Sequence, residues 1–246
     1  MISLKSKREI ELIRTASDIL KAVFSELKSC IKPGLRTIEL DEIAERSIRK
    51  QKAIPAFKNY NGFPASICVS INEEVVHGIP SQRKLANSDI VSIDVGVRYE
   101  GYSSDAARTW PVGKVSKEAL NLIDVTRESF FEGINAIRHG SKLGDLSFAI
   151  QHYVESHGFS VVRDYVGHGI GRHIHEEPQI PNFGKKGTGP LLEEGMTLAI
   201  EPMVNMGSWK VKTLDNQWTV VTRDGELSAH YENTILITKD RVEVLT

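Results

Sequence analysis

IVSIDVGVRYEGYSSDAART, residues 90–109, is the stretch that decides the fold of this chain. Apolar residues alternate with polar residues or glycine through its first half, which is the period of a strand with one buried face. A turn centred on Tyr99-Glu100 brings the chain back antiparallel and sets Asp94 directly opposite Asp105. Two carboxylates so close raise each other's pKa unless a cation lies between them. The alternative is that Asp105 lies in an ordinary loop and the two never meet.

The composition is that of a soluble globular protein, with 40% hydrophobic and 26% charged residues. No linker divides it, so we expect one domain over residues 1–246. The formal net charge of -1 excludes a general binder of DNA or of membrane surfaces. Two cysteines are too few for a disulfide scaffold, and no signal peptide or membrane span is evident, which favours a cytoplasmic protein. The basic segment 1–58 predicts either solvated helix faces or a docking surface.

Two helices followed by strands occur twice along the chain, a weak sign of internal duplication. The four expected helices begin at a capping box on Ser6, at a Thr37 cap, at a Ser116 cap (ending near Gly140), and around Leu146 (ending at Gly158). Strands are expected at 67–71, around 161, and at 197–202, 218–222, 228–238 and 242–245, with a hairpin turn at Asp224-Gly225. Residues 55–64 are too broken for regular structure. The pattern predicts an α+β domain with helices on one side of a sheet.

Two glutamates lie within predicted strands. Glu201 shares its face with the small Ala199, and Glu232 lies in the strand that follows. Glutamate is depleted from strands, and an inward carboxylate needs a partner. Each glutamate taken singly is more often a solvent-facing strand residue. Together with Asp94 and Asp105, and with few basic residues nearby in sequence, the four carboxylates favour a metal site.

A histidine cluster lies in GHGIGRHIHEEP, residues 167–178. Three glycines around His168 favour a backbone that makes close approaches. A single histidine is more often structural, but three within eight residues favour a ligand or a proton donor. His173 has no separate task in this interpretation.

Four carboxylates and one imidazole form an oxygen-rich ligand set that suits Co, Mn, Fe(II) or Zn. Two divalent ions balance four negative charges. Two metals about 3.5–4 Å apart that share a water form the usual two-metal hydrolytic arrangement. The pattern therefore predicts hydrolysis of a polar bond by a metal-activated hydroxide.

With these residues assembled, the sequence resembles the methionine aminopeptidases of type I, which have the pita-bread metallopeptidase fold. The resemblance covers nearly the whole chain, through NEEVVHGIP (72–80), SIDVGV (92–97), GHGIGRHIHEEP (167–178), AIEPMVN (199–205) and SAHYENTI (228–235). It implies a pseudo-twofold, curved antiparallel sheet with helices on its outer face. It also implies removal of the N-terminal methionine from nascent polypeptides, with a preference for small second residues.

The resemblance assigns roles residue by residue. It implies five metal ligands: Asp94, Asp105, His168, Glu201 and Glu232, of which Asp105 and Glu232 bridge the two ions. It implies that Glu201 also moves a proton, that His175 stabilises the tetrahedral oxygen and that His77 hydrogen-bonds the scissile amide.

The resemblance also implies a methionine pocket formed by Tyr60, Phe63, Cys68, Ile174 and Trp218, with His77 and His175 beside the substrate; ordinary core packing is the alternative for the five pocket residues. Ile174 stands where relatives often have Phe, and Phe57 where some have Cys, which affects the pocket's shape. A monovalent cation is implied near Asn72 and Ser228. We expect a monomer of bacterial type, without the N-terminal zinc-binding extension of some relatives, and a transient ribosome contact through the basic N-terminal segment.

Two rival functions remain. A proline-specific peptidase of the same fold usually has a further N-terminal domain, which a first helix starting at Ser6 argues against. A non-catalytic module that binds peptide termini is expected to have lost ligands, whereas all five are in this sequence.

Overall fold

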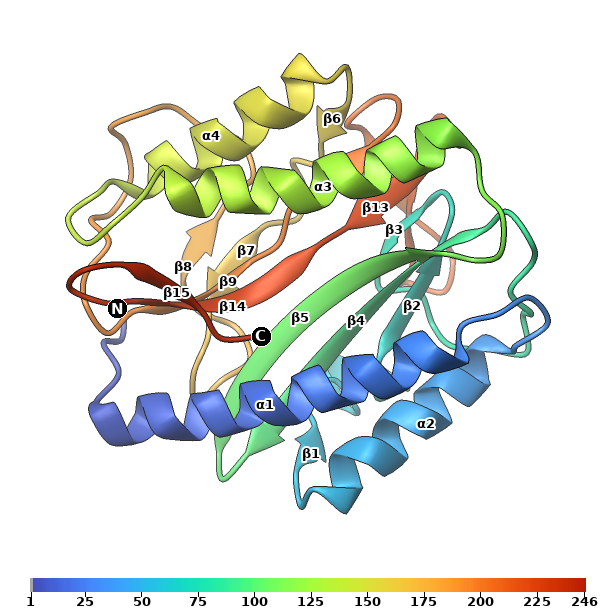
Figure 1. Ribbon diagram of the computed structural model, residues 1–246, viewed down its shortest axis with the longest axis horizontal. Helices are drawn as coiled ribbons and strands as arrows, with labels where there is room; N and C mark the ends of the chain where they lie inside the picture. The colour runs from blue at the N-terminus through green and yellow to red at the C-terminus, as the bar shows by residue number, and fades with distance from the viewer. Residues whose placement is uncertain (1) are drawn as a thin grey trace.

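A nine-stranded antiparallel sheet forms the centre of the computed structural model, which describes residues 2–246 (Figure 1). Seven strands follow the order β1-β4-β5-β14-β9-β7-β8, while β2 pairs with β4 and β15 with β14. Two three-stranded sheets, β13-β10-β6 and β11-β12-β3, complete the fold. The helices are α1 (Lys7–Cys30), α2 (Thr37–Lys50), α3 (Lys117–Asn135) and α4 (Leu143–Ser156), with a 3-10 turn at Tyr60–Gly62. The strands are β1 (Ile54–Pro55), β2 (Cys68–Ile71), β3 (Glu74–Val76), β4 (Ile90–Tyr99), β5 (Tyr102–Pro111), β6 (Ser160–Val161), β7 (Gly167–Gly169), β8 (Glu176–Ile180), β9 (Thr197–Ile200), β10 (Met203–Asn205), β11 (Val211–Thr213), β12 (Val220–Thr222), β13 (Ser228–His230), β14 (Glu232–Ile237) and β15 (Val242–Val244).

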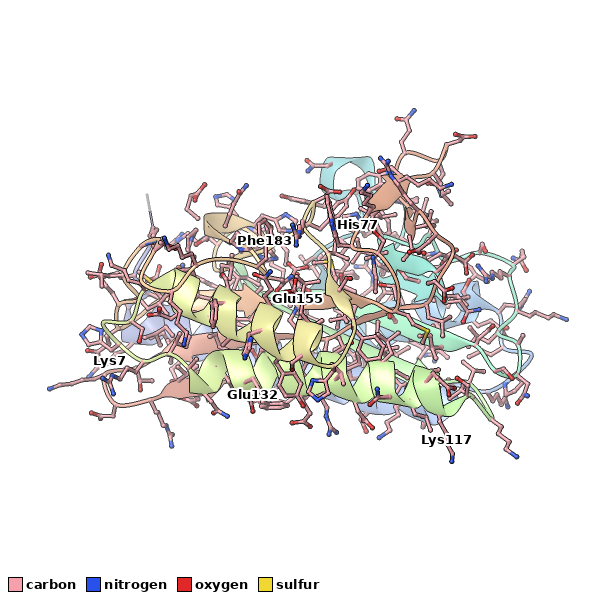
Figure 2. The ribbon with its side chains drawn as sticks, turned by 90° about the horizontal axis from the view of Figure 1, so that it is seen from above. Lys7, His77, Lys117, Glu132, Glu155 and Phe183 are labelled. Carbon is pink, nitrogen blue, oxygen red and sulfur yellow. The ribbon has the colours of Figure 1, made fainter. Side chains whose placement is uncertain are left out.

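The helices cover one face of the sheet in two pairs. Helices α1 and α2 pack on the half that contains β4, and α3 and α4 pack on the other half (Figure 1). Seen from above, the helices lie on one side and His77 lies on the other (Figure 2). The repeated order of two helices and then strands therefore gives the expected α+β layering. None of the helices in residues 2–246 is long and apolar enough to cross a membrane.

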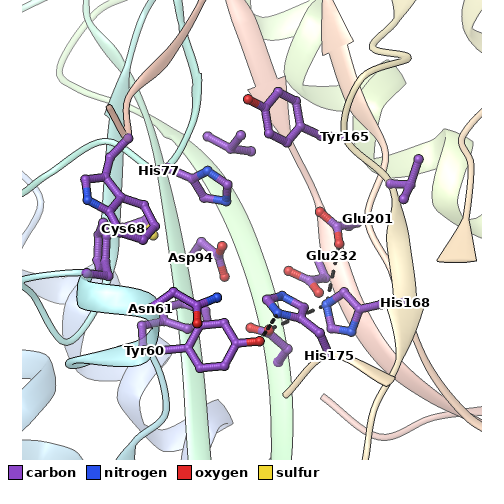
Figure 3. A pocket seen from close by; sticks show the side chains of 16 residues that line it. Tyr60, Asn61, Cys68, His77, Asp94, Tyr165, His168, His175, Glu201 and Glu232 are labelled. Atoms are coloured by element: carbon purple, nitrogen blue, oxygen red, sulfur yellow. Dashed lines mark hydrogen bonds and ion pairs between the residues drawn. The ribbon is translucent and has the colours of Figure 1, made fainter. Parts of the chain in front are cut away.

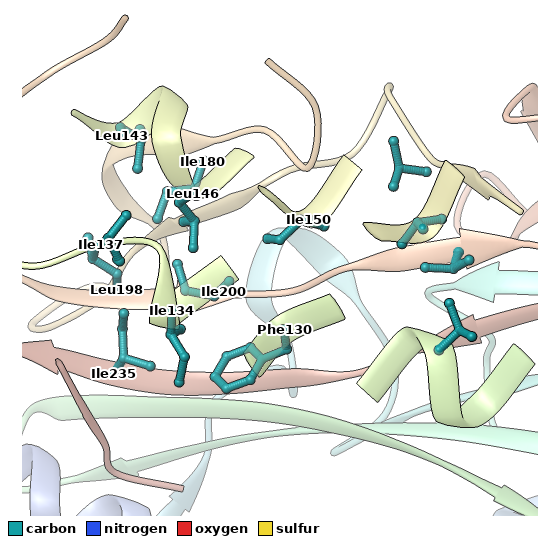
Figure 4. Packing of buried hydrophobic residues seen from close by; sticks show 14 of the residues in the cluster. Phe130, Ile134, Ile137, Leu143, Leu146, Ile150, Ile180, Leu198, Ile200 and Ile235 are labelled. Carbon is teal, nitrogen blue, oxygen red and sulfur yellow. The ribbon is translucent and has the colours of Figure 1, made fainter. Parts of the chain in front are cut away.

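Each half has its own hydrophobic core between helices and sheet. In the second half, Phe130 and Ile134 of α3 and Ile150 of α4 pack against Leu198 and Ile235 of the sheet (Figure 4). These side chains lie on the apolar helix faces that the spacing of hydrophobic residues in the sequence indicates. Their burial holds the sheet rigid beneath the opposite face, on which the polar residues of interest lie.

The helix starts confirm two of the three expected caps. The Ser6 hydroxyl accepts from the backbone N–H of Glu9, whose carboxylate accepts from the N–H of Ser6, and Ser116 caps α3. The Thr37 cap is wrong, because Thr37 is the first residue of α2 and Arg36 occupies the cap position. The Thr37 hydroxyl is instead engaged with the backbone of Ser81, donating to its carbonyl and accepting from its N–H.

The β4–β5 hairpin forms, but the expected register is wrong by two residues. Tyr99 pairs with Tyr102, so the turn is Glu100-Gly101, and both of these residues have positive φ. A two-residue turn of this type favours glycine at its second position, which places it one residue later than Tyr99-Glu100. Asp94 therefore lies opposite Ala107, and Asp105 lies opposite Gly96. The two aspartates are diagonal neighbours on one face rather than direct partners.

The turn at Asp224-Gly225 does not join two paired strands, as the sequence led us to expect. β12 pairs with β11 and β3, whereas β13 pairs with β10. The Asp224 carboxylate accepts from the N–H groups of Ser208 and Glu226, which closes a local turn instead. The expected strand at 228–238 is divided at Tyr231, so that β13 and β14 belong to different sheets.

Candidate metal centre

Small residues in the sheet bring the acidic side chains together. Ala107 of β5 lies opposite Asp94 of β4 and is also the register partner of Glu232 of β14. Ala199 of β9 is likewise the partner of His168 of β7. Because side chains two residues apart on a strand share a face, Asp105 projects on the same side as Ala107. Three strands thus place their carboxylates around one point.

The remaining donors come from the adjacent strands. Glu201 directly follows β9, and the His168 Nε2 atom lies 3.6 Å from Glu201 Oε1 and 4.0 Å from Asp105 Oδ2. Ligand atoms of Asp105, His168 and Glu232 all lie within 4.8 Å of one another. In Figure 3 the labelled side chains of Asp94, His168, Glu201 and Glu232 point into a common space, and all five candidate ligands line one cavity. The structure therefore brings all five candidate ligands to one site.

The carboxylates are buried without enough partners. Oδ1 of Asp94, Oδ1 of Asp105 and Oε1 of Glu232 are buried and have no hydrogen-bond partner. Burial raises the pKa of Asp105 well above its ordinary value, and the charges of Glu232 and Asp94 raise that pKa further. Burial, followed by the charges of Glu201 and Asp94, has the same effect on the pKa of Glu232. Buried anions without partners are costly, and divalent cations would satisfy this donor set.

His168 is oriented as a ligand. Its Nδ1 atom lies 2.9 Å from the carbonyl oxygen of Gly169, so that Nδ1–H donates there and Nε2 faces the carboxylates with a free lone pair. This is the usual outer hydrogen bond of a metal-binding histidine. Burial lowers the pKa of His168 to about 3, which keeps the imidazole neutral.

The two other candidate histidines flank this centre. His77 has a φ of 59° and packs edge-on against Tyr165 and Trp218. A Cβ at Gly78 would lie 2.0 Å from the carbonyl oxygen of Val69, so only glycine lets the two backbone segments lie this close. On the other side, His175 Nδ1 lies 2.9 Å from the Tyr60 hydroxyl, and its ring centroid is 4.4 Å from that of His168.

A cavity of about 260 Å³ has the carboxylates in one part of its wall and mainly apolar side chains in the rest. Tyr60, Phe63, Cys68 and Trp218 line it, together with His77 and His175. Burial raises the pKa of the Cys68 thiol, so this wall carries no charge. Ile174 is buried in a hydrophobic cluster with Phe63 and Cys68, but it does not line the cavity.

Sequence reasoning missed several residues of the site. Tyr165, Val166, Val76 and Asn61 line the cavity, as does Phe57, which the sequence singled out only for its identity. His230 is 1% exposed, and its unpartnered Nε2 lies 3.7 Å from Glu201 Oε2 and 4.0 Å from Glu232 Oε2. Its place two residues before Glu232, on the same face of a strand, was the available signal.

Comparisons with known proteins agree with this geometry. The model of metallopeptidase family M24 matches residues 11–239. A methionine aminopeptidase of Clostridium perfringens is 57% identical over 100% of this chain and 99% of its own length. The crystal structure of a methionine aminopeptidase from Thermotoga maritima has a TM-score of 0.98 at 47% identity, covering 100% of this chain and 99% of its own. A prolidase from Pyrococcus furiosus has a TM-score of 0.81 at 25% identity, and the match covers 99% of this chain but 65% of that one. These matches confirm the expected pita-bread fold.

Proposed function

Because this chain belongs to metallopeptidase family M24, we propose that it removes the N-terminal methionine from polypeptides whose second residue is small. The observation that carries the proposal is the convergence of Asp94, Asp105, His168, Glu201 and Glu232 in the wall of one cavity. Full-length identity of 57% to a protein named methionine aminopeptidase supports the substrate class. We further propose that residues 1–246 work as one catalytic domain.

The donor set fits two divalent ions, chosen from Co, Mn, Fe(II) or Zn. Asp94, Asp105, His168, Glu201 and Glu232 would hold them. Such ions polarise the substrate carbonyl and lower the pKa of water, so that hydroxide is available at neutral pH. Three buried carboxylate oxygens without hydrogen bonds support this assignment.

The protein's own groups would bind and orient the substrate. The walls formed by Tyr60, Phe63 and Trp218 suit an unbranched thioether side chain. Burial, together with the charge of His175, lowers the pKa of His77 to about 4, so its neutral ring has one N–H to donate at the scissile amide. His175, held by the Tyr60 hydroxyl, would donate to the oxygen that gains negative charge. Glu201 would accept a proton and pass it to the leaving amine.

A peptide panel tests this function. Metal-depleted protein supplied with Co(II), Mn(II) or Fe(II) is expected to release methionine from Met-Gly and Met-Ala peptides, but not from Met-Leu or Xaa-Pro. Faster cleavage of Xaa-Pro would instead establish the proline-specific alternative. Absence of turnover with every divalent metal, despite measurable peptide binding, would establish a binding module.

We also propose a monovalent cation near Asn72 and Ser228. The Ser228 N–H donates to the Asn72 carbonyl at 2.9 Å, and Asn72 has a φ of 58°, so the two backbones meet at a sharp bend. A K⁺ or Na⁺ ion beside these carbonyls would brace the strand that leads to Glu232. Replacing K⁺ and Na⁺ by tetramethylammonium at constant ionic strength should lower the thermal midpoint, and an unchanged midpoint would count against the ion.

For cellular context, we propose a cytoplasmic monomer that binds the ribosome transiently through its basic N-terminal segment. Lys7 and Arg8 are exposed and available for such a contact. Lys5 is not, since it is buried and paired with Glu176. Charge reversal at Lys7 and Arg8 should reduce co-sedimentation with ribosomes, and unchanged co-sedimentation would exclude this surface.

A further inference from the structure

Lys5 is a buried lysine just ahead of α1, with a side chain only 4% exposed. Its Nζ atom donates to Glu176 Oε2 at 2.7 Å and to the Ser3 carbonyl at 3.1 Å. Its backbone N–H donates to the Gly195 carbonyl at 2.8 Å, which fastens the segment to the turn that leads into β9. Lysine is almost never buried unless it is paired, so this placement is specific.

The partner carboxylate closes the loop that precedes β8. Glu176 Oε1 accepts from the N–H of His173 at 3.0 Å, and the Gly171 N–H donates to the His173 carbonyl at 3.1 Å. A Cβ at Gly171 would lie 2.6 Å from Lys5 Cε and 2.8 Å from Glu176 Oε1. The Lys5–Glu176 pair therefore lies directly against the backbone of this loop.

This loop carries two residues of the site. Ile174 packs in the hydrophobic cluster beneath the cavity, and His175 extends to the Tyr60 hydroxyl. His175 lies between Glu176 and His173, whose N–H donates to the Glu176 carboxylate, so this contact braces the backbone that carries the imidazole. A misplacement of about 1 Å in a catalytic group can cost a factor of about 10² in rate.

We propose that Lys5 is a positioning residue: by holding Glu176, it sets the position of His175 and Ile174 relative to the metal ligands. The inference rests on the proposed function, in which His175 acts on the substrate. It gives the N-terminal segment a role in turnover although Lys5 does not line the cavity.

Steady-state kinetics of four variants test this role. Lys5→Met is expected to lower kcat on a Met-Ala peptide at least tenfold while KM changes less than twofold, and Lys5→Arg should recover most of the loss. Lys28→Met is the matched control, since Lys28 is exposed on the helix that follows this segment, and it should behave as wild type. Glu176→Gln keeps an acceptor for the His173 N–H and should show the same kcat defect at a smaller size. A wild-type kcat for Lys5→Met, or a loss that matches its unfolded fraction, would overturn the proposal.

Hydrogen exchange separates this inference from the proposed function. If wild-type protein releases no methionine, the function fails, whereas the loop can still be tested without substrate. Lys5→Met is expected to speed amide exchange in residues 171–176 more than tenfold and to leave β4 and β5 unchanged. Unchanged exchange in 171–176 would overturn the positioning role, even if the peptidase activity is confirmed.

Discussion

Ala107 on β5 lies directly opposite Asp94 on β4, so a methyl group rather than a second carboxylate faces that aspartate. The same alanine is the register partner of Glu232. Ala107→Val is therefore expected to crowd both carboxylates and to abolish binding of the second equivalent of metal in calorimetric titration. Ala106→Val adds the same bulk on the core face of the same strand and should cost about 1–3 kcal/mol of stability while metal binding persists. Equal metal binding by both variants would refute the crowding argument.

His77→Ala should retain metal but lose activity, because His77 lines the cavity without being one of the candidate ligands. Loss of a donor at the scissile amide is expected to lower kcat by a factor of about 10²–10⁴. Metal content measured by mass spectrometry should remain as in wild type. Loss of metal from this variant would mean that His77 belongs among the ligands.

His230→Phe is expected to weaken metal binding although His230 was absent from the sequence-based ligand set. Its Nε2 lies within 4.0 Å of both Glu201 and Glu232, where an N–H can orient carboxylate oxygens. Loss of a group that orients metal-binding carboxylates typically costs 10- to 100-fold in metal affinity. His230→Gln, which keeps a donor, should lose less. Calorimetric affinities that are identical in all three proteins would rule the role out.

Without metal, the protein should become less stable as the pH rises. Burial raises the pKa of Asp94, Asp105, Glu201 and Glu232 in the metal-free protein. A carboxyl group whose folded pKa is raised contributes stability below its unfolded pKa of about 4, and that contribution is lost as pH rises through the folded pKa. In chelator, the free energy of unfolding should therefore fall between pH 5 and pH 8. Divalent metal at 100 times its Kd should add about 2.7 kcal/mol, and a flat profile in chelator would contradict this account.

Glu45 on α2 should stabilise the fold in the opposite pH direction. The hydrogen bond that Lys58 donates lowers the pKa of Glu45 from its ordinary 4.5 to about 2. Hydrogen bonds from Arg49 and Ser66 contribute to this lowering of the pKa. That stability is present above pH 4.5 and is lost as pH falls toward 2. Because the side chain is 23% exposed, Glu45→Gln should cost only about 1 kcal/mol at pH 7 in urea unfolding. Exposed Glu42→Gln on the same helix is the control, and an equal cost at pH 2 would contradict the pairing.

Local patterns were sufficient to predict most helices and the acidic strands. The Ser6 capping box and the alternation through Asp94 are readable because cap chemistry and side-chain period depend only on near neighbours. The curved sheet and the family were expected only from the resemblance of five motifs to a known family.

Sequence reasoning failed where distant contacts compete with local preference. Thr37 is not a cap because Ser81 engages its hydroxyl, and the hairpin register followed the glycine at 101 rather than the centre of the polar stretch. The division of the expected strand at Tyr231, which sends β13 and β14 into different sheets, likewise depends on contacts with distant strands.

The candidate ligands are spread from Asp94 to Glu232, and β14, which carries the last of them, lies in the middle of the sheet between β5 and β9. During synthesis, the two aspartates leave the ribosome long before their glutamate and histidine partners. A chain that ends before β14 would thus have Asp94 and Asp105 but would lack Glu232 and the strand that joins β5 to β9. The complete set of ligands is therefore present only after β14 has been synthesised.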